Sequence, residues 1–319
     1  MRSARTPRSL RFERYDDIVV SPHLDDAVYS CAGTILAARE LGRRVLVITV
    51  FGHGRGDSPP EEGLFGDYVT REAEDREAMA IVDADYVWLD LPELAFRPRT
   101  FRERLAQLSP RRAERDDPAF VVARDRVREL VTALAADGAR ISFPLGIGFH
   151  PDHRLCFAIG RELALESRYD VSFYEDVPYA VVPALRRLRF EAIGANGPGV
   201  EALAGPREGS VPRLGGSKGT LVVPVALGLF TLISLLHAKL RPKDAAPLAL
   251  VGEEHVIDGQ RLRKVRAIEA YRSQTPLFFP EDVESVLPRS RGALVERVFR
   301  LAPSHRSVRA ATSAIEVHA

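Results

Sequence analysis

Two short segments of the chain concentrate side chains that can bind a metal or move a proton. Residues 23–26 read HLDD, and residues 150–153 read HPDH. Both segments combine imidazoles with carboxylates, which zinc accepts as ligands in proteins. Each segment alone is more typical of a structural helix cap than of a ligand set. The chemistry therefore depends on whether the fold brings the two segments together.

A buried strand is expected just before each segment, and a helix just after it. The strands are Asp17–Pro22, an apolar run that ends in a proline, and Arg140–Phe143. The helices are Leu24–Leu41 and Pro151–Glu166, and the proline that begins the second one suits the first helical position. Both segments therefore lie at corners where a strand passes into the N-terminus of a helix.

The same alternation of strand and helix continues along the chain. Strands that alternate with helices of this length predict βαβ units, and hence an α/β fold with a parallel sheet flanked by helices. The carboxyl ends of parallel strands are where ligands bind, so we expect the two corners to meet in one cleft. The further strands expected are Arg44–Phe51, Tyr86–Leu89 and Val171–Glu175, and the further helices are Tyr68–Val82, Val121–Ala136 and Arg261–Arg272.

The two corners together contain what a catalytic zinc site requires. Two imidazoles and one carboxylate leave the fourth position of a zinc ion open for water. The helix dipole favours carboxylates at the first turn, which keeps Asp25 and Asp26 ionised as ligand and base. A nearby carboxylate can take the proton of a water molecule that attacks a carbonyl. The corners thus predict a metallohydrolase, while their spacing leaves the individual roles open.

We divide the chain into three parts. Residues 1–14 are expected to form a flexible N-terminal tail, because no apolar stretch follows their positive charges, which also argues against a secretory signal. Residues 15–193 form the catalytic core. Residues 194–319 form a C-terminal addition to the same domain, since a stretch rich in Gly, Pro and Ser breaks the alternation at its start.

The C-terminal addition contains an apolar segment, residues 220–236, as well as the helix at 261–272. The segment has no charged residue, but it is shorter than the roughly 20 residues of a spanning helix. It also contains Pro224 and Gly228. We therefore expect a helix that is buried or covers the substrate; contact with a membrane surface is the second interpretation and a membrane span the third.

Composition restricts the partners and the compartment. Lys and Arg number 45 against 44 Asp and Glu, a formal charge of +1 that gives no basic surface for nucleic acid. Cys31 and Cys156 are the only cysteines, which suits a reducing compartment. We expect a cytoplasmic protein that acts on a small molecule, and the sequence carries no signal for an oligomeric state.

The two corners resemble the hallmark motifs of the PIG-L/LmbE family of de-N-acetylases, which are close to HPDDE and HPDH. Further matches are TREAED with Arg71 and Glu74, FYEDVPY at Phe173–Tyr179, and the residues from Lys264 to Gln274. The resemblance covers roughly residues 17–274. It implies a Rossmann-like sheet and the zinc-dependent removal of an acyl group, usually acetyl, from an amino sugar or a natural product that contains one.

The resemblance also implies a role for individual residues. Asp25 would be the general base that activates the attacking water. His150, oriented by Asp152, would stabilise the oxyanion or protonate the leaving amine, and Arg71 would hold the substrate. The ligands of one Zn²⁺ per chain, or of another divalent metal, would be His23, Asp26 and His153.

Two residues depart from the family pattern. Ala27 stands where members often have Glu, and Gly148 stands where some mycothiol-pathway members have a catalytic Tyr. The second departure leaves the oxyanion contacts to other groups. Two alternatives remain: a metal-dependent hydrolase of another amide or ester, and a catalytically silent sugar-binding module. Asp25 argues against the silent module, because a binder needs no second carboxylate beside the ligand.

Overall fold

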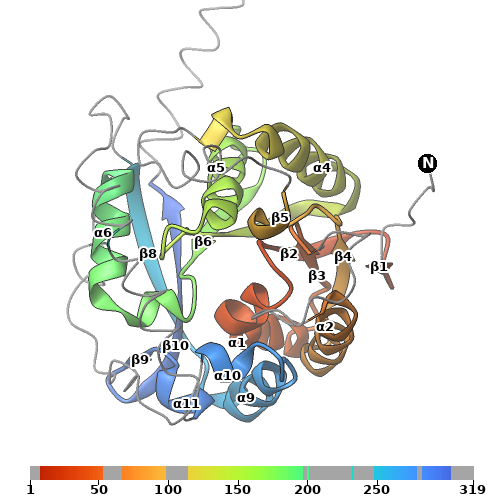
Figure 1. Ribbon diagram of the computed structural model, residues 1–319, viewed down its shortest axis with the longest axis vertical. Coiled ribbons are helices and arrows are strands. Elements are labelled where there is room, and N and C mark those ends of the chain that lie inside the picture. The colour runs from red at the N-terminus through yellow and green to blue at the C-terminus, as the bar shows by residue number, and fades with distance from the viewer. Residues whose placement is uncertain are drawn as a thin grey trace, which may run out of the picture.

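The computed structural model describes residues 8–52, 67–97, 114–196, 200, 232, 248–278 and 282–302. Its described part is an α/β fold in which helices cover both faces of a central sheet (Figure 1). The strand order along this sheet is β1-β4-β3-β2-β5-β6-β10-β8-β7, and β9 pairs with β10.

The middle of the sheet is parallel, as the alternation of strands and helices predicts. Ile18, for example, lies opposite Leu46 on one side and Ile141 on the other. Along the chain, β3 and β4 extend this parallel part on one side of β2, and β5 and β6 then extend it on the other side. The carboxyl ends of β2 and β5 are therefore neighbours. These strands are β2 (Tyr15–Ser21), β3 (Val45–Thr49), β4 (Asp85–Trp88), β5 (Ala135–Pro144) and β6 (Asp170–Tyr174).

Apolar side chains alternate between the two faces of the sheet because successive residues of a strand point to opposite sides. Ile18 and Val20 pack into the core under α4, α5 and α6, whereas Val19 packs into the core under α1, α2 and α9 (Figure 1). The helices are α1 (Asp26–Glu40), α2 (Tyr68–Val82), α4 (Pro118–Leu134), α5 (Pro151–Leu165), α6 (Pro183–Ile193), α9 (Arg261–Glu269), α10 (Thr275–Phe278) and α11 (Val283–Val286).

Several helix boundaries differ from the expected ones, and α9, for example, ends at Glu269 rather than Arg272. Helix α1 begins at Asp26 rather than Leu24, because the Asp26 carboxylate accepts the His23 N–H at 2.9 Å and holds the preceding residues in a turn. Helix α4 begins earlier than expected, at Pro118, because Asp117 caps it by accepting the Ala119 N–H. It also ends earlier, and the next residues already belong to β5.

The sheet continues beyond β6 with antiparallel strands that the sequence analysis did not predict. β10 (Ala293–Leu301) pairs antiparallel with both β6 and β8 (Leu248–Val256). The sheet is therefore mixed: its middle is parallel, as predicted, and at the edge that the C-terminal part adds, β10 pairs antiparallel. Two short strands, β7 (Ala195–Asn196) and β9 (Arg289–Ser290), complete this part.

A buried ion pair joins this C-terminal part to helix α1. Lys264 Nζ lies 2.5 Å from Glu296 Oε1 and donates to the carbonyl of Tyr29 at 3.0 Å. The Glu296 carboxylate accepts the main-chain N–H groups of Gly33 and Thr34, at 2.8 and 2.7 Å. In an α-helix the N–H of residue i pairs with the carbonyl of residue i−4. Gly33 and Tyr29 are such a pair, so the ion pair contacts both the N–H and the carbonyl of one helical hydrogen bond of α1.

The N-terminal residues are more ordered than expected. β1 (Arg8–Ser9) pairs antiparallel with β4, and Arg11 forms ion pairs with Asp83 and Asp85. The expected flexible tail over residues 1–14 is therefore wrong for residues 8–14. The reason is that the outer edge of β4 offers main-chain groups for pairing, with two carboxylates beside it.

Within the described ranges, no helix is long and apolar enough to cross a membrane. The apolar segment 220–236 lies outside these ranges apart from Leu232, which is exposed.

Candidate metal and catalytic site

The first corner is held by hydrogen bonds from Ser21, the last residue of β2. Its Oγ donates to the carbonyl of His23 at 2.6 Å and accepts the N–H of Ala27 at 2.9 Å. The side chain of Ala27 is fully buried in the core under α1, so no acid supports the site from this position. Asp25 and Asp26 project from the corner and are both buried, with 5% and 6% of their surface exposed.

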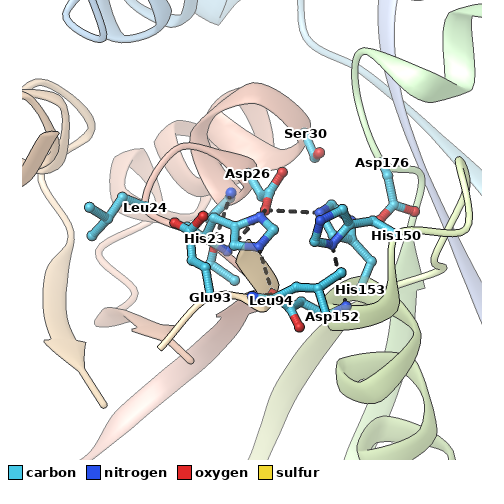
Figure 2. A network of polar contacts seen from close by, with 12 residues as sticks. His23, Leu24, Asp26, Ser30, Glu93, Leu94, His150, Asp152, His153 and Asp176 are labelled. Atoms are coloured by element: carbon cyan, nitrogen blue, oxygen red, sulfur yellow. Dashed lines mark hydrogen bonds and ion pairs between the residues drawn. The ribbon is translucent and has the colours of Figure 1, made fainter. Parts of the chain in front are cut away.

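The second corner turns sharply before helix α5. Gly148 and Phe149 both have positive φ angles, +87° and +61°, the second of which is uncommon for a residue with a side chain. His150 then caps the helix, and its Nδ1 accepts the main-chain N–H of Asp152 at 3.3 Å. His153 lies in the first helical turn and is 1% exposed. Because β5 pairs with β2, this corner faces the first one (Figure 2).

The three side chains predicted to bind zinc converge on one point. Asp26 Oδ2 lies 3.0 Å from His23 Nδ1 and 3.2 Å from His153 Nε2 (Figure 2). Two ligands of one tetrahedral zinc ion lie about 3.3 Å apart when each is about 2.0 Å from the metal. The spacing of these donor atoms therefore fits a zinc ion.

Each of the two imidazoles also contacts a second carboxylate through its other ring nitrogen. His153 Nδ1 lies 2.7 Å from Asp176 Oδ1, and His23 Nε2 lies 3.2 Å from Asp152 Oδ2 (Figure 2). Histidines that bind metals commonly donate their remaining N–H to a carboxylate, which fixes the tautomer and the ring orientation. The arrangement leaves His23 Nδ1 and His153 Nε2 facing Asp26.

His150 lies beside this group and offers an alternative ligand. Donor atoms of His23, His150 and His153 lie within 4.8 Å of one another and could also hold a metal ion. The Nδ1 of His150 is a hydrogen-bond acceptor, which leaves the proton of the neutral ring on Nε2. Burial lowers the pKa of His150 to about 3, so the ring stays neutral. Of Asp26 and His150, Asp26 is the anionic donor, and its carboxylate already lies beside the imidazoles of His23 and His153.

The carboxylate of Asp152 contacts His23, the main-chain N–H of Leu94 at 3.0 Å, and the guanidinium of Arg97. Burial opposes ionisation, but Arg97 and the contact with His23 lower the pKa of Asp152 below its ordinary value. The main-chain N–H of Asp152 donates to His150 while its carboxylate contacts His23, and the orienting role of Asp152 stays a prediction. Arg97 was missed by the sequence analysis because no motif marks it.

Asp25 is suited to accept a proton. Burial and the neighbouring charge of Asp26 raise the pKa of Asp25 to about 6, against the opposing charges of Arg71 and His23. A general base works best when its pKa lies near the working pH.

Arg71 reaches the site from helix α2 and is almost fully buried. Its Nη1 lies 2.9 Å from Glu93 Oε1, and its guanidinium lies over the ring of Tyr68 at 5.1 Å. Its Nε has no hydrogen-bond partner among the residues that the structure describes. A buried donor of this kind can bind an acceptor on a substrate. Glu93, which fixes the guanidinium, follows the predicted strand Tyr86–Leu89. Its position just after a strand end is the signal that could have marked Glu93 as a site residue.

The structure explains why residue 148 is a glycine. A Cβ atom at this position would lie 2.6 Å from Cγ of Tyr179, so the aromatic ring occupies the space of a side chain at residue 148. The Tyr179 ring lies edge-on to His153, with 5.9 Å between ring centroids. Burial, and then the charges of Asp26 and Asp25, raise the pKa of Tyr179, so its hydroxyl remains protonated and lies near the first corner.

Asp176 is the most important residue that the sequence analysis left without a role. It follows β6 in the FYEDVPY segment and is 1% exposed. Its Oδ1 contacts His153, and its Oδ2 accepts the N–H of Ile147 at 2.9 Å, which ties the end of β6 to the loop of the second corner. Its place at the carboxyl end of a strand that neighbours β5 is the signal that could have indicated it.

The chain is similar to several known proteins. A family model described as GlcNAc-PI de-N-acetylase (PIG-L) matches residues 18–164. A 2'-N-acetylparomamine deacetylase from Streptomyces fradiae is 29% identical over 177 residues, which cover 53% of this chain and 60% of the relative. The match therefore spans less than two thirds of that relative's length.

Two solved structures have a similar fold. One is the A40926 pseudoaglycone deacetylase Dbv21, with a TM-score of 0.58 and 18% identity, covering 91% of this chain and 98% of the other. The other is the zinc inhibited form of teicoplanin deacetylase Orf2, with a TM-score of 0.56 and 17% identity, covering 89% and 96%. At these identities the likeness concerns the fold.

Proposed function

We propose that this chain, whose residues 18–164 match the PIG-L family model, is a member of that family and hydrolyses the N-acetyl group of an amino sugar, or of a natural product that contains one. The products are a free amine and acetate. The observation that carries the proposal is the position of Asp26, between two imidazoles that are each backed by a further carboxylate. The deacetylase named for 2'-N-acetylparomamine and the two deacetylases of similar fold support this substrate class.

We assign the metal to His23, Asp26 and His153, with one zinc ion per chain. Two neutral imidazoles and one carboxylate are a donor set of the kind found in catalytic zinc sites. A zinc ion, when bound, supplies Lewis acidity that polarises the acyl carbonyl and acidifies water. His150 remains outside the ligand set and is available for the reaction.

The protein's own groups then move the protons. Asp25 takes a proton from the water molecule whose oxygen attacks the carbonyl carbon, and its raised pKa suits this task. His150 carries a proton on Nε2, which it donates in a hydrogen bond to the carbonyl oxygen as negative charge develops there. The bond between carbon and nitrogen breaks as the amine nitrogen gains a proton, and Asp25, which carries the proton taken from the water molecule, is the group that can deliver it.

Arg71 holds the substrate in this proposal. The pairing with Glu93 fixes its guanidinium at a short reach from Asp25, and its buried Nε is left to donate to a sugar hydroxyl or carbonyl oxygen. The acetyl group would then lie beside the two corners while the remainder of the substrate extends outward.

The test is a panel of acetylated substrates given to the purified, zinc-loaded protein. The panel pairs N-acetylated with O-acetylated forms of aminoglycoside and glycopeptide sugars, and free amine and acetate are measured separately. We expect amine release from N-acetyl substrates and its loss in His153→Ala together with most of the bound metal. Acetate release from the O-acetyl forms alone would favour an esterase, and full metal binding without any turnover would favour a silent binding module.

A further inference from the structure

Two sequence motifs meet behind the first corner. TREAED lies on helix α2, and the segment from Tyr271 to Gln274 follows helix α9. Asp75 of the first motif contacts Tyr271 of the second. Both are fully buried, with 0% and 1% of their surface exposed, and neither belongs to the metal ligands or to the reacting groups described above.

The hydroxyl of Tyr271 has two oxygen neighbours. It lies 2.6 Å from Asp75 Oδ1 and 3.0 Å from the carbonyl oxygen of Leu24. The other carboxyl oxygen of Asp75, Oδ2, accepts the indole N–H of Trp88 at 2.7 Å. Leu24 stands between His23 and Asp25 in the first corner (Figure 2). A chain of hydrogen bonds thus runs from strand β4 through Asp75 and Tyr271 to the peptide that joins Leu24 to Asp25.

The number of hydrogens available for donation in this chain of hydrogen bonds decides whether the Asp75 carboxyl is protonated. A tyrosine hydroxyl has one hydrogen to donate, and a carbonyl and an ionised carboxylate can only accept. If Asp75 were ionised, the hydroxyl would serve either Asp75 or Leu24 but not both. If Asp75 carries a proton on Oδ1, it donates to Tyr271 and Tyr271 donates to Leu24, so all of these contacts are satisfied. Buried polar groups are normally paired in this way.

The surroundings of Asp75 favour the protonated form. Burial raises the pKa of Asp75 to about 7, and the charge of Asp25 adds to this effect. The hydrogen bonds from Tyr271 and Trp88 and the charge of Arg71 act in the opposite direction. These groups face Asp75 from the first corner, the turn after α9, strand β4 and its own helix.

We propose that Asp75, in its protonated form, and Tyr271 are positioning residues that hold the Leu24–Asp25 peptide and thereby aim the Asp25 carboxylate. The inference rests on the proposed function, because Asp25 is the base in that reaction. Deprotonation of Asp75 makes the carboxylate compete with Leu24 for the hydroxyl hydrogen of Tyr271. The support of Asp25 then weakens as the pH rises through the titration of Asp75.

A neighbouring contact between the same two segments provides a matched control. Glu74 accepts the main-chain N–H of Ser273 at 2.9 Å and its hydroxyl at 2.7 Å. This contact also ties helix α2 to the turn after α9, yet its two hydrogen bonds run to Ser273 rather than to the corner. Ser273→Ala removes one of them and leaves Asp75 and Tyr271 unchanged.

The test compares Asp75→Asn, Tyr271→Phe and Ser273→Ala in zinc-loaded enzyme. An asparagine at residue 75 can donate to Tyr271 with its amide and accept from Trp88 with its oxygen, as the protonated acid does. We expect the kcat of the wild type to decline with a midpoint near pH 7, and we expect Asp75→Asn to keep kcat near pH 6 and to lose this decline. Tyr271→Phe should lower kcat about 10- to 100-fold, the scale of a small displacement of a reacting group, with little change in KM or bound zinc.

A second measurement tests the proton on Asp75 without any substrate. Carbon-13 NMR of protein labelled at aspartate carboxyls, with Asp75→Asn to assign the signal, should give a midpoint near 7 for Asp75. A midpoint below about 5, close to that of a free aspartate, would overturn the inference even if the enzyme deacetylates sugars. So would an Asp75→Asn enzyme as impaired as Tyr271→Phe, or an equal loss in Ser273→Ala. Failure of the proposed function leaves this titration as an independent result.

Discussion

The contact between His153 and Asp176 leads to a prediction about metal affinity. The two carboxyl oxygens of Asp176 accept from two donors, His153 Nδ1 at 2.7 Å and the N–H of Ile147 at 2.9 Å. Asp176→Asn keeps the shape but has one acceptor oxygen, so its NH₂ group must face one of these donors. It also removes the negative charge that makes the imidazole a stronger ligand.

The magnitude follows from the loss of one charged hydrogen bond behind a ligand. Such changes weaken metal binding about 10- to 100-fold, which corresponds to about 1.4–2.7 kcal/mol. Competition for Zn²⁺ with a fluorescent chelator measures the affinity directly. The matched control is Asp170→Asn at the other end of β6, where the carboxylate pairs with Arg300 and is partly exposed. Wild-type zinc affinity in Asp176→Asn, with the fold intact, would refute the ligand role of His153 that we propose.

Three further predictions concern the base, the second corner and the response to pH. Asp25→Asn should keep zinc, measured by metal analysis, while kcat falls about 10²–10⁴-fold, and loss of zinc would mean that Asp25 is a ligand. Gly148→Ala should displace the Tyr179 ring and strain a backbone with φ of +87°, which lowers the free energy of unfolding by about 1–3 kcal/mol in denaturant titrations. Because the pKa of Asp75 is about 7 in the folded chain and about 3.9 when unfolded, its contribution to stability is complete below pH 4 and is lost as the pH rises through 7. Asp75→Asn should therefore gain about 4 kcal/mol in unfolding free energy relative to the wild type between pH 4 and pH 9, and an unchanged difference would contradict the raised pKa.

The parallel part of the fold could be predicted because its signals are local. A run such as Val45–Thr49 is buried on both faces, so apolar residues follow one another without a gap. The corners after β2 and β5 were identified because chemically active residues follow such runs directly. The order of the strands, which makes these two ends neighbours, then brings the corners together.

The antiparallel edge could not be predicted in the same way. Strand β10 contains Glu296 and Arg297, which are almost fully buried because Lys264 and Glu254 pair with them. Their charges hide the apolar alternation that indicates a strand, and their partners lie 32 and 43 residues away in the sequence. A single sequence does not reveal such pairing.

The residues of the candidate site likewise fall into those that local patterns predict and those that they do not. The residues of the two corners were identified from their types and spacing. Arg97 and Glu93 act on the site from a loop after β4, and Asp176 acts from the end of β6. Their importance depends on which strands are neighbours, a property of the tertiary structure rather than of any local pattern.

The ion pair between Lys264 and Glu296 has a consequence for the order in which the molecule is made. Helix α1 is synthesised before residues 264 and 296, so the main-chain groups of Tyr29 and Gly33 find these partners only when those residues have been added. A nascent chain that ends before β8 lacks both charges, together with the hydroxyl of Tyr271 that reaches the first corner. The first corner is therefore translated before the residues that support it, and an unfinished polypeptide holds the proposed metal-binding segments without the contacts that shape them.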